Sequence, residues 1–131
     1  MKLIIVFILL LISIRAFAPG TKAIYIAVKD ALTEFDALIK AVAWVESKNG
    51  LYVYNPVENA VGWLQIRQIR IDHYNKLRGT NYSLEDCYNY ELSKDIFVFF
   101  AQGKSYKRAS MDWNGSGPKT IEYWNKVRAR L

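Results

Sequence analysis

Glu46 is the side chain best placed for chemistry, because it falls on the apolar face of a helix predicted over residues 33–49. At about 100° per residue, Glu46 lies within the stripe that Phe35, Ile39 and Val42 form. A carboxyl group on a buried face loses hydration, which raises its pKa and lets it act as a general acid near neutral pH. The alternative is that Glu46, close to the helix end, turns to solvent or pairs with an arginine.

Two later segments place side-chain amides beside glycines. The first is Gly62-Trp63-Leu64-Gln65-Ile66, and the second begins at Trp113-Asn114. The amides of Gln65 and Asn114 can donate to and accept from sugar hydroxyls, and Gly62 permits close approach of the backbone to a ligand. The same residues also suit ordinary loops, in which amides cap backbone groups and glycine makes a turn.

Aromatic residues accompany these segments. Trp63, Trp113, Tyr52 and Tyr54 could stack on sugar rings, although aromatic residues near a cleft more often belong to the core. The sequence pattern does not separate these two interpretations.

The chain is predicted to be mainly α-helical, a single domain of four or five helices with little or no sheet. Periodicity and capping patterns predict helices at 33–49, within 68–78, from about 83 to 102, and from 118 to 131. For the second helix, the expected apolar face contains Ile66, Ile69, His73 and Leu77, so His73 is predicted to be a partly buried structural residue.

Three blocks of this sequence resemble, in order, the signatures of the superfamily of goose-type lysozymes and soluble lytic transglycosylases. These blocks are a helix ending in Glu46-Ser47, the Gly-x-x-Gln-Ile turn within residues 60–66, and the turn at Trp113–Pro118 before a last helix. The resemblance implies a lysozyme-like domain in residues 19–131. It also implies that Glu46 is the catalytic acid and that Ser47, Gly62, Gln65 and Asn114 belong to the substrate-binding cleft.

The sequence departs from the family pattern at Trp113, where a tyrosine is usual. The phenol that would hydrogen-bond near the catalytic carboxylate is therefore either missing or supplied from elsewhere, with Tyr52, Tyr54 and Tyr123 as the candidates. The turn keeps the glycine and the glutamine of the family motif.

The resemblance leaves two reactions open after the acid has protonated the glycosidic oxygen. A lytic transglycosylase closes a 1,6-anhydro ring with the C6 hydroxyl of the substrate and requires no second acid. An inverting lysozyme uses a second carboxylate to activate water. The candidates for it are Glu58, Asp72 and Asp112, each of which is also an ordinary surface charge. We favour the transglycosylase.

The first 18 residues resemble a secretory signal peptide, with Lys2, an apolar run and Ala16-Phe17-Ala18 as a cleavage pattern. The run is shorter than the roughly 20 residues that span a bilayer. We therefore expect an exported, periplasmic or secreted monomer without a membrane span after removal of the leader. The chain of 131 residues carries a formal net charge of +6, which falls to +4 when the leader with Lys2 and Arg15 is removed. A surface of this charge would attract the peptide carboxylates of peptidoglycan glycan strands.

Two other classes of function compete with this interpretation. A non-catalytic wall-binding module would not need an acid in the apolar stripe. A nucleic-acid binder would need a concentrated basic surface, whereas the basic residues are scattered and their only local cluster is Lys104, Lys107 and Arg108. No cofactor or metal is expected, because one Cys and one His cannot form a closed zinc site. Cys87 is predicted to be a small buried side chain.

Overall fold

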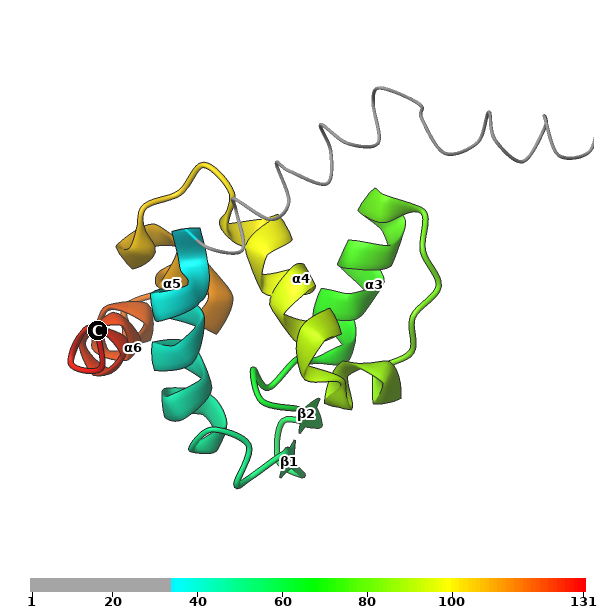
Figure 1. Cartoon of the computed structure of the whole chain (residues 1–131), viewed down its shortest axis with the longest axis horizontal. Helices are drawn as coiled ribbons and strands as arrows, with labels where there is room; N and C mark the ends of the chain where they lie inside the picture. Colours follow the sequence, from blue (N-terminus) through cyan, green and yellow to red (C-terminus); the bar gives the residue numbers. More distant parts are fainter. Residues whose placement is uncertain (1–33) are drawn as a thin grey trace, which may run out of the picture. The chain divides into compact units, whose positions relative to one another are not determined.

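The Glu46 helix, residues 34–47, is the first element of the computed structural model, which describes residues 34–131 (Figure 1). Phe35, Leu38, Ile39 and Val42 are at most 1% exposed, so the predicted apolar stripe is confirmed as the buried face. The predicted signal peptide, residues 1–18, and the first part of the predicted domain lie outside the described residues.

Short connections join the remaining elements. These are β1 (Tyr54–Asn55), β2 (Ala60–Val61), α3 (Gln68–Arg78), the 3₁₀ helix η1 (Glu85–Tyr88), α4 (Tyr90–Ala101), α5 (Tyr106–Asn114) and α6 (Lys119–Arg128). The strands pair antiparallel, Tyr54 with Val61 and Asn55 with Ala60. A mainly helical chain with five α-helices and one small hairpin in residues 34–131 confirms the predicted fold class. The helix α5 was not predicted.

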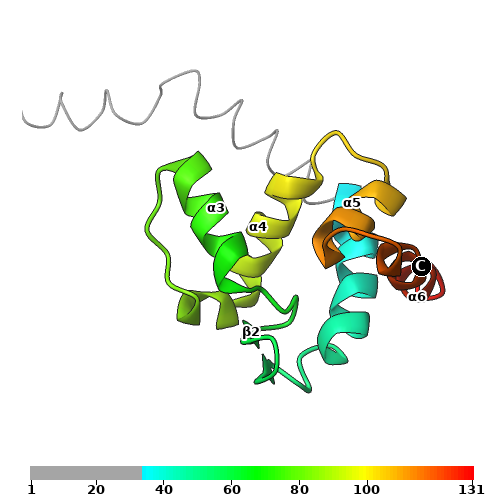
Figure 2. The same ribbon diagram turned by 180° about the vertical axis from the view of Figure 1, so that it is seen from behind.

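Helices α3 and α4 lie side by side in both views (Figures 1 and 2). The ring of Tyr74 on α3 meets that of Phe99 on α4 edge to face at 5.3 Å. Buried side chains of α4 and α6, including Ile96, Phe97 and Val127, complete the core. Within residues 34–131, no helix is long and apolar enough to cross a membrane.

The predicted apolar face of α3 is wrong. Ile69 is 76% exposed and Leu77 is 56% exposed, whereas Ile71 and Tyr74 are buried. The helix is rotated relative to the prediction because Tyr74 packs against the aromatic residues of α4. His73 is consequently exposed, and its predicted role as a partly buried structural residue is also wrong.

Cys87 is buried, as predicted. It lies in η1, whose start is held by reciprocal bonds between Ser83 and Asp86, with the Ser83 N–H donating to the Asp86 carboxylate at 2.7 Å. The helix predicted to run from residue 83 is therefore divided, and α4 begins anew after Asn89, whose side chain accepts from the Leu92 N–H at 3.1 Å.

Candidate active site

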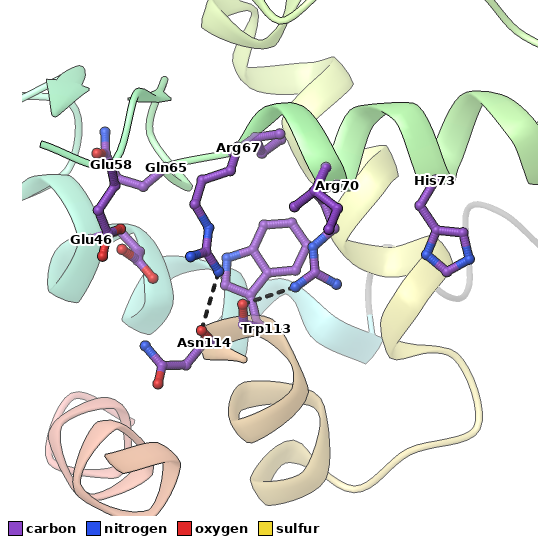
Figure 3. Close-up of a pocket in the computed structure, with 10 residues that line it drawn as sticks. Glu46, Glu58, Gln65, Arg67, Arg70, His73, Trp113 and Asn114 are labelled. Carbon is purple, nitrogen blue, oxygen red and sulfur yellow. Dashed lines mark hydrogen bonds between the residues drawn. The ribbon is translucent and has the colours of Figure 1, made fainter. Parts of the chain in front are cut away.

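A cleft of about 240 Å³ runs from the end of the Glu46 helix, past the turn before α3, to the middle of α3 (Figure 3). Its far wall is the end of α5. Ten residues line the cleft: Glu46, Glu58, Gln65, Ile66, Arg67, Ile69, Arg70, His73, Trp113 and Asn114. The structure thus brings three of the predicted site residues, Glu46, Gln65 and Asn114, to one cavity.

Glu46 is half-buried at one end of this cleft. Burial raises the pKa of its carboxyl to about 7, with a smaller contribution in the same direction from the charge of Glu58. A hydrogen bond from Tyr123 and the charge of Arg67 act in the opposite direction. A carboxyl with a pKa near 7 is present in both protonation states at neutral pH, which suits a group that must first donate and then accept a proton.

Tyr123 provides the phenol beside this carboxyl. Its hydroxyl donates to Glu46 Oε1 at 2.6 Å, across 77 positions of the sequence. Burial and the adjacent Glu46 raise the pKa of Tyr123 well above its ordinary value, so the phenol keeps its proton and remains a donor. Of the three tyrosines considered for this contact, Tyr52 and Tyr54 are exposed and only Tyr123 reaches Glu46.

Gln65 is positioned by a tight turn of residues 62–65. The backbone N–H and C=O groups of Val61 and Ile66 exchange bonds of 2.9 Å across the base of the turn, and Gln65 itself has a left-handed φ of 51°. Its side-chain nitrogen donates to the carbonyls of Gly62 at 2.9 Å and Tyr52 at 3.2 Å. The amide nitrogen therefore holds the loop, and the amide oxygen is the group left for a ligand.

Gly62 is buried beneath this turn and does not line the cleft. Its φ is +79°, and a Cβ atom at this position would collide with the backbone carbonyl of Cys87. Glycine is required here by the turn and by close packing against η1, rather than by the approach of a ligand.

Ser47 also lies away from the cleft, with 1% of its surface exposed. Its hydroxyl lies 2.8 Å from the carbonyl of Trp63 and accepts a bond of 2.9 Å from the Gly50 N–H. Because Lys48, Asn49 and Gly50 all have left-handed φ angles after the helix end, Ser47 holds the reversal of the chain next to Glu46.

Asn114 and Trp113 form the far wall of the cleft. Asn114 is the last residue of α5, and its carbonyl accepts a bond of 3.4 Å from Arg67. The Trp113 indole N–H donates to the Leu64 carbonyl at 3.1 Å, and its ring packs against Phe97 at 4.8 Å, so Trp113 belongs to both core and cleft. Trp63 instead packs against Tyr90, outside the cleft.

Of the three candidate second carboxylates, Glu58 alone lines the cleft. It follows β1 in a turn where the Asn55 side chain accepts bonds from the N–H groups of Val57 and Glu58. Asp72 accepts a bond from Gln68 on the exposed side of α3, and Asp112 pairs with Lys104 and Arg108.

The contribution of α3 to the cleft was not predicted from the sequence. Arg67, Arg70 and His73 recur every third residue, a spacing that puts them on one side of a helix. The sequence therefore contained this pattern, but His73 was assigned to the expected apolar face of α3 and the two arginines were not considered as a group.

Among residues 34–131, no three His, Cys, Asp or Glu side chains gather as ligands for a metal ion. Comparison of the chain with models of protein families, with curated proteins and with solved structures found no match.

Proposed function

We propose that this protein is an exported, lysozyme-like lytic transglycosylase that cleaves the β-1,4 bond between MurNAc and GlcNAc of peptidoglycan, with Glu46 as general acid and base. One observation carries the proposal: a half-buried carboxyl in a cleft, with a pKa of about 7 and a phenol donor on one oxygen. The three motifs that resemble the transglycosylase superfamily support the same function, and the substrate and reaction are taken from that resemblance.

In the first step, protonated Glu46 gives its proton to the glycosidic oxygen. The bond from that oxygen to C1 breaks, the leaving sugar departs as an alcohol, and C1 becomes an oxocarbenium ion. Because Oε1 of Glu46 accepts the hydrogen bond from Tyr123, the acidic proton is carried by Oε2. Glu46 therefore donates its proton to the glycosidic oxygen from Oε2.

In the second step, the Glu46 carboxylate accepts the proton of the C6 hydroxyl while O6 attacks C1 of the same sugar. A 1,6-anhydro ring forms and Glu46 regains its proton, so the cycle closes without water. Gln65 and Asn114 serve to hold sugar hydroxyls or the N-acetyl group along the cleft, because side-chain amides can donate and accept at once.

Hydrolysis is the second candidate reaction, and the position of Glu58 is the observation that favours it. Glu58 lines the same cleft, and its charge raises the pKa of Glu46. In this variant, the Glu58 carboxylate takes a proton from water as that water attacks C1, and the product carries a reducing end.

Digestion of purified peptidoglycan by the full chain, followed by mass spectrometry, tests the proposal. We expect fragments with 1,6-anhydro ends from the parent protein and none from Glu46→Gln. Reducing-end fragments that depend on Glu46 would establish the hydrolase instead. Intact glycan from the folded parent protein would overturn both reactions and favour a wall-binding module.

A further inference from the structure

Arg67 and Arg70 line the part of the cleft that lies beyond Gln65, on the side away from Glu46 (Figure 3). Together with His73 they form what we call the basic arm of the cleft. The arm runs from the residue before α3 to the second turn of that helix. General acid catalysis at Glu46 does not require it.

Neither guanidinium of the basic arm forms a salt bridge in the part of the chain that the structure describes, although the charge of Asp112 acts on Arg70 and that of Arg67 acts on Glu46. The ion pairs there join Lys40, Lys94, Lys104 and Arg108 to acids, and none includes Arg67 or Arg70. Asp112, the acid of α5, lies 2.9 Å from Lys104 and 3.0 Å from Arg108. Two half-buried guanidinium groups therefore face one cavity, each repelling the other.

The backbone at the end of α5 fixes both guanidinium groups. Arg70 donates to the carbonyls of Trp113 at 2.9 Å and Asp112 at 3.1 Å and lies over the Trp113 ring at 4.6 Å. Arg67 donates to the Asn114 carbonyl at 3.4 Å. Each guanidinium has five N–H donors, so most donors of both groups form no hydrogen bond with the described residues.

We propose that the basic arm is a subsite for a carboxylate of the glycan, bound by Arg67 and Arg70 next to the sugar that reacts at Glu46. This inference rests on the proposed function and deepens it. Peptidoglycan offers that carboxylate from two sources, the lactyl group of MurNAc and the stem peptide. A neutral polymer such as chitin offers none, so the arm selects for charged glycan strands.

Binding to the full-length Glu46→Gln variant, which removes turnover, tests the subsite. Three soluble probes of equal sugar number are compared by calorimetry: a neutral GlcNAc oligomer, a peptide-free GlcNAc-MurNAc strand, and a strand that carries stem peptides. We expect at least one charged strand to bind more tightly than the neutral oligomer. A preference that is already present in the peptide-free strand identifies the lactyl carboxylate, and one confined to the third probe identifies the stem peptide.

Adding Arg67→Gln should weaken binding of the preferred charged strand about tenfold and leave the neutral oligomer unchanged. Arg78→Gln, which removes the same charge from the exposed end of α3, is the matched control and should change neither. Arg70→Lys provides a second variant, since it keeps the charge but loses the paired donors to α5. If Arg67→Gln weakens the binding of all three probes equally, the subsite is overturned. The same conclusion follows if binding is not weakened at all and the variant has the same unfolding temperature as the parent, which shows that it is folded.

The subsite and the proposed function fail separately in these experiments. If the neutral oligomer binds as well as the charged strands and peptidoglycan is still cleaved, the inference is wrong and the glycosidase stands. If peptidoglycan stays intact while a charged strand still binds through Arg67, the cleft is a binding site without catalysis.

Discussion

The two ends of the cleft hold charge in different ways. At the acid end, formed by Glu46, Glu58 and Tyr123, burial raises the pKa of Glu46 to about 7, so its charge varies with pH. In the basic arm, burial and the charge of Arg67 lower the pKa of Arg70, yet a guanidinium stays protonated at every physiological pH. One end is therefore suited to moving a proton and the other to holding a fixed anion.

Substitutions at the two ends should differ most in their effect on the rate of cleavage. Glu46→Gln should lower kcat for peptidoglycan by about 10² to 10⁴, because the amide cannot donate or accept the proton. Binding of a peptidoglycan strand, measured by calorimetry, should remain within a few-fold of the parent. Glu34→Gln, on the exposed side of the same helix, is the control; a Glu46→Gln protein that still cleaves at the parent rate would remove Glu46 from the mechanism.

The variable charge of Glu46 should also make the free energy of unfolding depend on pH. Because the pKa of Glu46 rises from 4.5 to about 7 in the folded state, folding favours the protonated carboxyl. The resulting stability is fully present below about pH 4.5 and is lost as the pH rises through about 7, by roughly 3 kcal/mol in total. In urea unfolding, Glu46→Gln should therefore gain in stability relative to the parent from pH 4.5 to pH 8. A difference that stays constant over this range would show that Glu46 is well hydrated.

Tyr123→Phe should act on both position and pKa. The hydrogen bond from Tyr123 lowers the pKa of Glu46, so its removal should move the alkaline limb of the kcat/KM profile to higher pH. We also expect kcat to fall about tenfold, the value of one hydrogen bond to a charged group. Tyr52→Phe, at an exposed tyrosine, is the control and should leave the profile unchanged. If the alkaline limb of the Tyr123→Phe profile does not shift, the Tyr123 hydroxyl does not influence the pKa of Glu46.

Glu58→Gln should have the smallest effect if the reaction is a transglycosylation. Loss of this charge lowers the pKa of Glu46, so the alkaline limb should move to lower pH by less than about one unit while kcat stays within a few-fold. A hydrolase that uses Glu58 to activate water would instead lose about 10² or more in kcat. Asp72→Asn, outside the cleft, is the comparison for both outcomes.

The sequence was informative where a pattern depends on local geometry. The stripe on the Glu46 helix, its acid, the position of α3 and the start of the helix after Pro118 follow from periodicity and capping. The lysozyme-like class remains a proposal, because it depends on resemblance alone.

Features that depend on contacts between distant segments could not be predicted. The helix α5 has only nine residues, and its buried face consists of Ala109, Ser110 and Trp113, a pattern too short to indicate a helix without the core against which it packs. The choice of Tyr123 among three tyrosines depends on α6 lying beside the Glu46 helix. The spacing of Arg67 and Arg70 indicates a shared helix side, but the carbonyls that fix them in the cleft lie more than 40 positions away and could not be predicted.

The hydrogen bond between Glu46 and Tyr123 joins the first and the last helix of the described residues. Its two partners are 77 positions apart, so Tyr123 is synthesised long after the residues of the Glu46 helix. In the unfolded chain the Glu46 carboxyl is hydrated and ionised at neutral pH, whereas burial in the folded protein raises its pKa to about 7 even though the Tyr123 hydrogen bond acts in the opposite direction. The raised pKa of Glu46 is therefore a product of completed folding, because it depends on burial that the unfolded chain lacks.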